Sequence, residues 1–157
     1  MIRCLLILCM LSACVPVKVT VGSGEPTRRA IATNAVQDAT FDRLLNAQRA
    51  AVGTAAVTPN AQLAAAAKAH AADMNARNYF SHRTPEGQSS GDRAARFGVP
   101  ACGLGENIAQ GQGSSAEVFE GWMQSAGHRR NMLNKIMTHY GLGVDGKTWV
   151  LMLYTPC

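Results

Sequence analysis

The sequence predicts an α+β fold in which helices cover a small antiparallel sheet. Apolar residues recur at helical spacing through the middle of the chain, whereas strand-like alternation is confined to its C-terminal end. Helices first and strands last are typical of α+β domains. The 157 residues suffice for one domain with a single core. Only 16% of them are charged and alanine is abundant, so we expect a helix-rich globule packed with small residues.

Two helices are expected at the start of the folded part, which we place at 38–157. The first begins near Asp38 and ends at Gly53, because glycine commonly follows a helix. One of its faces is formed by Phe41, Leu44, Leu45, Gln48 and Val52. A turn at 58–60 opens the second helix, which is rich in alanine and runs to about Arg77. One face of this helix is formed by Leu63, Ala67, His70 and Met74.

The middle of the chain is predicted to alternate between loops and helices. A short helix is expected over 92–97, and the glycine-rich stretch 102–113 is expected to be turn or loop. A longer helix is predicted over 114–126, because Ser114 and Glu117 fit a capping box and Gly127 fits a stop signal. Its buried stripe is formed by Val118, Phe119, Trp122 and Met123. His128 would therefore lie just where this helix ends.

A β-hairpin is predicted at the C-terminal end. Tyr140, Leu142 and Val144 alternate with small residues, and the stretch 148–154 is β-branched and aromatic. The dipeptide Asp145-Gly146 between them is typical of a tight hairpin turn. We therefore expect two antiparallel strands here.

Two motif matches do not fit their surroundings. Residues 87–91 match the pattern of a nucleophile elbow, but a polar loop containing proline precedes the serine where a strand is required. Residues 141–146 match the dinucleotide-binding pattern, but a strand follows where a helix N-terminus is required. We assign no function to either match.

The N-terminal residues 1–13 resemble an export signal. Arg3 precedes the apolar run 4–11, which is too short for a permanent membrane span. The segment Leu11-Ser12-Ala13-Cys14 resembles a bacterial lipobox, so we expect Cys14 to be the acylated first residue of the mature protein. Residues 14–37 read as a flexible linker. The alternative is an ordinary cleaved signal and a secreted, soluble protein.

The cysteines of the mature domain are expected to form a disulfide. Cys4 and Cys9 leave with the signal, so Cys102 and Cys157 remain as a pair in an oxidising compartment. The competing interpretation is a catalytic thiol at Cys102 near Glu106.

The formal net charge of +5 does not indicate a nucleic-acid partner. Basic residues are scattered: Arg28 and Arg29 lie in the linker, while Arg93, Arg96, Arg129 and Arg130 alternate with apolar positions. No basic stripe with interleaved aromatic residues is present. We therefore expect no nucleic-acid binding.

Three titratable residues are candidates for a site. His82 and His128 each lie near the end of a predicted element, and Glu106 lies between them in the chain. A carboxylate beside two imidazoles orients one of them and raises its pKa. No close ligand pair of the His-Glu-x-x-His or Cys-x-x-Cys kind is present. His70 is expected to pack on the face of its helix, and His139 is expected to lie at the start of a strand.

Four successive motifs resemble the signatures of the CAP superfamily, which includes cysteine-rich secretory proteins, antigen 5 and pathogenesis-related proteins of group 1. The first two motifs are Tyr79-Phe80-Ser81-His82 and Gly105-Glu106-Asn107-Ile108-Ala109. The third is the segment 122–133, which begins at Trp122 and contains Gly127-His128-Arg129, and the fourth is His139-Tyr140-Gly141-Leu142-Gly143-Val144. The resemblance covers 38–157 and is greatest to the bacterial, secreted branch.

The resemblance implies a three-layer α-β-α sandwich, which agrees with the α+β prediction, and a cleft with two histidines and two acids. His82, Glu106 and His128 match three of these four positions. Ser125 occupies the position of the second acid, and its hydroxyl supplies no charge. In related proteins the two histidines hold a divalent metal such as zinc, so His82 and His128 are candidate ligands. We expect Asn107 to lie at the same cleft.

Three functions are compatible with these residues. The first is a monomeric binding protein of the bacterial cell envelope, anchored by lipid at Cys14, that holds a small ligand, lipid, sterol or peptidoglycan fragment. The second is a metal-assisted hydrolase, resembling a peptidase, with Glu106 as general base. The third is a structural domain in which the cleft residues only brace the fold. No nucleophile is recognisable, so we expect a binding protein rather than an enzyme.

Overall fold

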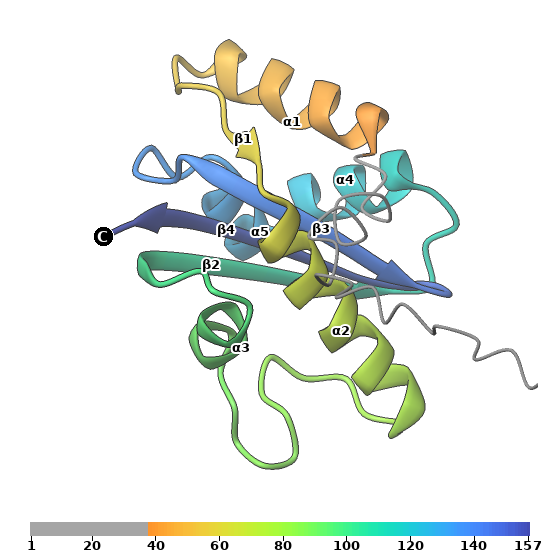
Figure 1. The fold of residues 1–157 in the computed structure, drawn as a ribbon. Helices are drawn as coiled ribbons and strands as arrows, with labels where there is room; N and C mark the ends of the chain where they lie inside the picture. Colours follow the sequence, from red (N-terminus) through yellow and green to blue (C-terminus); the bar gives the residue numbers. More distant parts are fainter. Residues whose placement is uncertain (1–37) are drawn as a thin grey trace, which may run out of the picture.

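The computed structural model describes residues 38–157, which form five helices and four strands (Figure 1). In chain order the elements are α1 (Ala39–Ala51), β1 (Thr58–Pro59), α2 (Ala61–Ala76), α3 (Ser90–Arg96), β2 (Ala101–Gln110), α4 (Ser115–Gln124), α5 (Ala126–Met132), β3 (His139–Asp145) and β4 (Thr148–Pro156). The predicted export signal, Cys14 and the linker 14–37 lie outside the described residues. In the described part of the chain, no helix has the length and apolar character needed to span a membrane.

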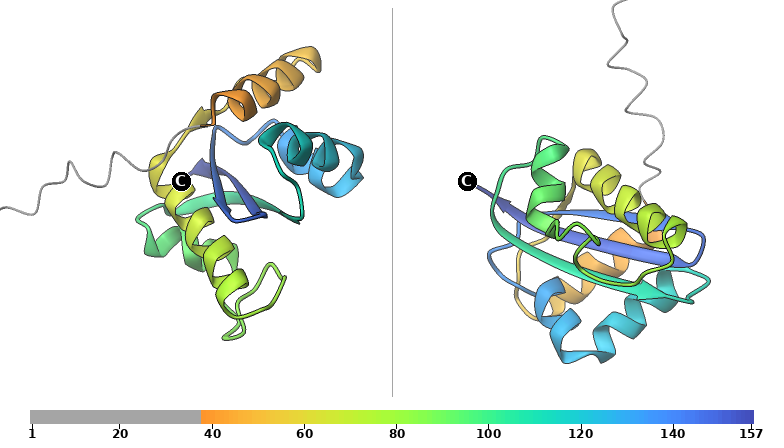
Figure 2. Two further views of the ribbon diagram at one scale, coloured as in Figure 1. Left: turned by 90° about the vertical axis from the view of Figure 1, so that its right-hand side faces the viewer. Right: turned by 90° about the horizontal axis from the view of Figure 1, so that it is seen from below.

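The helices form two layers with the sheet between them, which confirms the predicted α-β-α sandwich (Figure 2). The strands lie in the order β1-β3-β4-β2. β4 pairs antiparallel with both β3 and β2, whereas β1 pairs parallel with β3 over two residues. Apolar residues of α2 and α3 pack on one face of the sheet, and those of α1, α4 and α5 pack on the other. The sheet is therefore mixed, with a core on each face.

The three helices at the start of the domain form where the sequence predicts them. Asp38 caps α1 by accepting a hydrogen bond from the amide of Phe41 at 3.0 Å, and Asn60 caps α2 by accepting one from the amide of Leu63 at 2.8 Å. The short helix predicted over 92–97 is α3. The predicted face of α2, which includes His70, is buried.

The prediction of a turn or loop over 102–113 is wrong for most of its length. Residues 101–110 form the strand β2, which pairs with β4 from Gln110↔Thr148 to Ala101↔Pro156. Glycines lower the strand propensity of this stretch, but pairing with β4 outweighs that local preference. At the free edge of β2, the carbonyl oxygen of Ile108 accepts a hydrogen bond from Nε1 of Trp122 at 3.3 Å.

The predicted helix over 114–126 forms as α4, but a second short helix that the sequence analysis did not predict follows it at once. Ser114 caps α4 as expected, but α4 ends at Gln124, and Ser125 adopts an extended conformation (φ −91°, ψ 123°). The chain then turns directly into α5, so Gly127 does not stop a helix. His128 consequently lies in the first turn of α5 and not in a loop after α4. The extended residue Ser125 therefore changes the chain direction before His128.

A buried arginine holds the segment after α5 against α1. Arg49 is fully buried, and its guanidinium donates hydrogen bonds to the carbonyl oxygens of Ala55, Met132, Asn134 and Met137 at 2.7–3.1 Å. These acceptors satisfy a cation that has no carboxylate partner among residues 38–157. The end of α5 is thereby tied to the first helix.

Gly141 and Gly143 allow α2 to lie directly on β3. A Cβ atom at Gly141 would lie 2.2 Å from the amide nitrogen of Ala64, and one at Gly143 would lie 2.1 Å from that of Lys68. The hairpin of β3 and β4 forms as predicted, with Asp145 paired to Thr148 across the turn. The glycines that matched a dinucleotide-binding pattern thus serve the packing of a helix on a strand.

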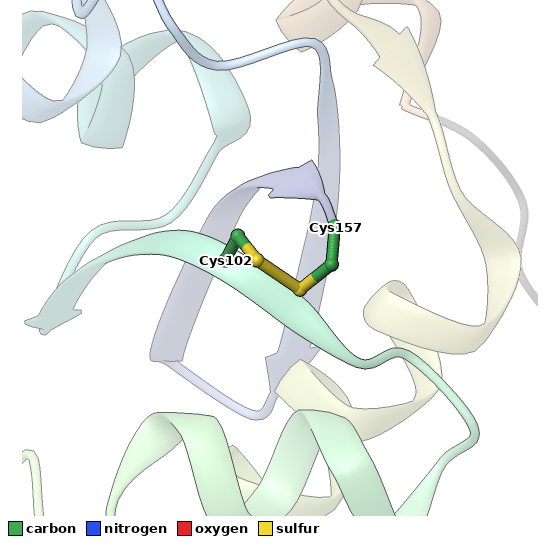
Figure 3. Close-up of a disulfide and its surroundings, with 2 residues drawn as sticks. All are labelled: Cys102 and Cys157. Carbon is green, nitrogen blue, oxygen red and sulfur yellow. A yellow bond between two sulfur atoms is a disulfide. The ribbon is translucent and has the colours of Figure 1, made fainter.

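Cys102 and Cys157 form a disulfide, as expected from their pairing in the sequence (Figure 3). Their Cα atoms are 4.8 Å apart, and the bond joins the start of β2 to the last residue of the chain. The alternative of a catalytic thiol at Cys102 is incompatible with this bond.

We predict that Gly143→Ala destabilises the domain by about 1–3 kcal/mol, because α2 must move away from β3 to admit the methyl group. Urea unfolding followed by circular dichroism measures this change. Gly121→Ala is the matched control: Gly121 lies in α4 with nothing within 4 Å of an added Cβ, so alanine there should stabilise the protein by about 0.5–1 kcal/mol. Equal effects of the two substitutions would contradict the packing argument.

We also predict that replacing both Cys102 and Cys157 by alanine lowers the free energy of unfolding by up to ~4 kcal/mol, because the bond restricts the unfolded chain. The native protein should resist a thiol reagent until reductant is added, and mass spectrometry of labelled peptides detects this. Labelling of Cys102 without reductant would show that the bond is absent.

Candidate functional site

Glu106 of β2 is a buried carboxylate with a partner at each oxygen. Its side chain is 4% exposed. Oε1 lies 2.9 Å from Nδ1 of His82, and Oε2 lies 2.5 Å from Nη2 of Arg93. An ionised carboxylate is stable away from water only when it is paired in this way. Glu106 is therefore the centre of a buried network that joins β2 to α3 and to the loop before α3.

Arg93 of α3 is the member of this network that sequence reasoning missed. Its side chain is 7% exposed, and it donates hydrogen bonds to the carbonyl oxygens of His82 and Gln88 at 3.1 Å in addition to its ion pair with Glu106. In the sequence it looks like one of several scattered basic residues. The local sequence around Arg93 does not reveal its burial, because its carboxylate partner Glu106 lies in another element.

His82 is held by the buried network yet remains exposed. It lies in the loop between α2 and α3, and its side chain is 57% exposed. Because a carboxylate only accepts, Nδ1 donates to Glu106 and Nε2 is left for other contacts. The hydrogen bond that His82 donates to Glu106 raises the pKa of His82, although partial burial and the charge of Arg93 act in the opposite direction.

His128 has the opposite electrostatic environment. Burial lowers its pKa, and the positive charge of His82 lowers it further. The ring of His128 lies 6.4 Å from that of Trp122 between centroids. The structure thus brings His82, Glu106 and His128 into one region at the edge of the sheet.

Asn107 was expected at the cleft, but it is fully buried and does not line it. Successive strand residues point to opposite faces, so Asn107 points toward α5 while Glu106 points toward α3. Nδ2 of Asn107 donates to the carbonyl oxygen of His128 at 3.1 Å, and Oδ1 accepts from Asn131 at 2.9 Å. Asn131 also donates to the carbonyl oxygen of Glu106 at 3.2 Å. Asn107 is therefore a positioning residue that fixes α5, and with it His128, against β2.

Ser125 lies at the junction of α4 and α5 and is half-buried. Its side chain forms no capping hydrogen bond with α5. It carries no charge that could hold a protonated histidine in the way an acid at this position would.

The residues present do not fit a resident zinc ion. Such a site requires three or more protein ligands, and no group of that size is found among the histidines, cysteines and acids of residues 38–157. Both oxygens of Glu106 and Nδ1 of His82 are already engaged.

His70 is a packing residue, as the sequence predicts, and it also supports the site. It is 1% exposed, and its Nε2 lies 2.9 Å from the carbonyl oxygen of Ser81. This contact ties the chain just before His82 to α2.

Comparison with known proteins agrees with this geometry. Residues 43–150 match the cysteine-rich secretory protein (CAP) family. The Bacillus subtilis (strain 168) protein YkwD is 40% identical over 108 residues, which are 68% of this chain and 42% of YkwD. The Bacillus subtilis membrane protein YlbC is 38% identical over 104 residues, 66% of this chain and 30% of YlbC. The chain thus spans less than half the length of either relative.

A crystal structure with the same fold is that of an extracellular protein containing an SCP domain from Bacillus anthracis str. Ames. It superposes with a TM-score of 0.71 at 34% sequence identity, covering 73% of this chain and 39% of that one. The chain therefore belongs to the cysteine-rich secretory protein (CAP) family.

Proposed function

We propose that this protein binds a small acidic component of the cell envelope at the cleft formed by His82 and His128. The observation that carries the proposal is the state of His82, which the buried Glu106 holds by Nδ1 while most of its side chain stays at the surface. A histidine that only braced the fold would be expected to be buried like His70. The exposed Nε2 of His82 is therefore available for a ligand.

The two imidazoles are suited to different ligand groups. The pKa of His82 is raised and that of His128 is lowered, so over an interval of pH His82 is a cation while His128 is neutral. A cationic imidazole donates a hydrogen bond to a carboxylate or phosphate, and a neutral one can accept a hydrogen bond from a hydroxyl or amide. A ligand with an anionic group next to a donor matches this pair, and peptidoglycan fragments and anionic lipid headgroups have that chemistry.

The hydrolase alternative has less support. A general base must reach the proton that it removes, but both oxygens of Glu106 are occupied and its side chain is almost inaccessible. Cys102 is in a disulfide and is not a nucleophile. The donor set also does not fit the metal that this mechanism would use.

We further propose that the domain lies outside the cytoplasm, anchored by lipid at Cys14. The proposal is supported by the export pattern of residues 1–13, by the disulfide, and by relatives described as an extracellular protein and a membrane protein. A lipid anchor would keep the cleft close to the envelope components that it is proposed to bind.

We predict that the pKa of His82 is higher than that of His128, and that Glu106→Gln lowers the pKa of His82 because the anionic acceptor is lost. NMR titration of the imidazole signals measures both values, with circular dichroism confirming that the variant is folded. Glu120→Gln, at an exposed acid of α4, is the matched control and should leave both pKa values unchanged. If His82 titrated below His128, the proposed pairing of charges would be wrong.

Calorimetric titration with muropeptides and with vesicles of phosphatidylglycerol tests the binding proposal. Affinity should fall as the pH rises through the pKa of His82, because deprotonation removes the positive charge that holds the anion. His82→Gln should weaken binding by about tenfold or more, since a hydrogen bond to a charged group is lost. His139→Gln, a histidine of β3, should bind like the wild type.

The same experiment separates the alternatives. Chelator should leave the affinity unchanged. If neither muropeptides nor vesicles produced a heat of binding, the binding proposal would be refuted. If the protein cleaved the muropeptides and Glu106→Gln abolished the cleavage, the hydrolase function would be established instead.

Cys14→Ala in a bacterial expression host should move the protein from the membrane fraction to the soluble fraction, because acyl chains provide the anchor. Fractionation followed by immunoblotting detects the change. A variant that stays with the membrane would show that Cys14 is not the anchor.

A further inference from the structure

A second cavity lies apart from the histidine cleft. It has a volume of about 330 Å³ and lies between α2, α3 and the loop 84–88. Small-molecule sites typically have volumes of about 300–1,000 Å³. His82, Glu106 and His128 do not line it, and Arg93 is the residue that it shares with the buried network.

One cation at this pocket forms no ion pair with the residues that the structure describes. Of the arginines that line it, Arg77 pairs with Glu86 and Asp73, and Arg93 pairs with Glu106. Arg96 donates a hydrogen bond to the amide oxygen of Gln88 at 3.1 Å and forms no ion pair within 38–157. Its remaining N–H groups are suited to a carboxylate.

Two buried polar atoms on the pocket residues also have no hydrogen-bond partner in the described part of the chain. They are Nδ1 of His70, a residue that is 1% exposed, and Nε of Arg93, a residue that is 6% exposed. Nε2 of His70 faces a carbonyl oxygen and must therefore donate, which leaves Nδ1 as an acceptor. Since unpaired buried polar atoms are rare in native proteins, one acceptor and one donor here call for an outside partner.

The rest of the lining is mixed: Asp73, Thr84, Glu86 and Gln88 are polar, whereas Ala66, Ala69 and Phe97 are apolar. Ala66 and Ala69 lie on the α2 side, and Phe97, which is 38% exposed, lies at the end of α3. This combination of a cation, an acceptor, a donor and a small apolar surface limits the kind of ligand that fits.

We propose that this pocket binds a short peptide or N-acyl amino acid that ends in a free carboxylate. The carboxylate pairs with Arg96, and the amide group supplies an N–H for His70 and a carbonyl oxygen for Arg93. A small side chain packs against Ala66, Ala69 and Phe97. Both unpaired atoms lie below the accessible surface, so binding requires the loop 84–88, which includes the buried Thr84, to move outward and release the contacts of Gln88 with Arg93 and Arg96.

NMR titration of the full mature domain with N-acetyl-alanine tests the proposal. We expect saturable shifts of the Phe97 ring signals and of the Ala66 and Ala69 methyl signals, and a change in the Nδ1 signal of His70 as it accepts a hydrogen bond. N-acetyl-alanine amide, which has the same shape but no charge, should bind about tenfold more weakly or not at all.

Substitutions at Arg96 provide the second readout, and the residue is exposed, so they should not disturb folding. Arg96→Gln should weaken binding of N-acetyl-alanine by about tenfold, whereas Arg96→Lys should retain part of the affinity. Arg43→Gln removes the same charge from exposed α1 on the other side of the sheet and should bind like the wild type. Arg96→Gln should also keep the pH-dependent binding at the His82 cleft, so the two proposals fail independently.

Three outcomes would overturn the inference. They are no saturable shift with N-acetyl-alanine, equal binding of the uncharged amide, and equal competition by inorganic phosphate, which would indicate a non-specific anion site. An unchanged Nδ1 signal of His70 in the bound state would also contradict the proposed placement of the amide.

Discussion

The close contact between α2 and β3 is the constraint on which the rest of this domain depends. Gly141 and Gly143 have no side chains, so the backbone of α2 lies against the strand at a distance that a Cβ atom would prevent. That distance sets the height of the whole α2 and α3 layer above the sheet. It also sets where the chain emerges from α2, and His82 lies a few residues beyond that point. The geometry of the cleft is therefore an indirect consequence of helix–sheet packing.

The buried carboxylate of Glu106 connects the α3 layer and the loop before it to β2 at the candidate site. Its ion pair with Arg93 offsets the desolvation free energy of burying both charges. Its hydrogen bond with His82 gives a surface imidazole a defined orientation. On the other face of β2, Asn107 and Asn131 attach α5 and so place His128. One strand thus positions two histidines with opposite pKa shifts through side chains on its two faces. Arg93 also borders the second pocket, so the two regions share a wall.

Where prediction succeeded, the signal was local. The caps at Asp38, Asn60 and Ser114 and the hairpin turn after Asp145 each depend on a few adjacent residues. Where it failed, the determining contact was distant in the chain. β2 is a strand because β4 pairs with it, despite its glycines. The break at Ser125 and the buried role of Arg93 likewise depend on neighbours that the local pattern does not reveal.

Sequence patterns alone were enough to predict the α+β class and the cysteine pair, and the family motifs singled out His82, Glu106 and His128 as candidates. These features follow from short-range patterns or from ordered motifs along the chain. The folded structure was needed to show that Glu106 is paired with Arg93, that Asn107 is a buried brace, and that Arg96 forms no ion pair within residues 38–157. Burial and charge pairing are properties of groups brought together from different elements, so they exist only in the folded chain.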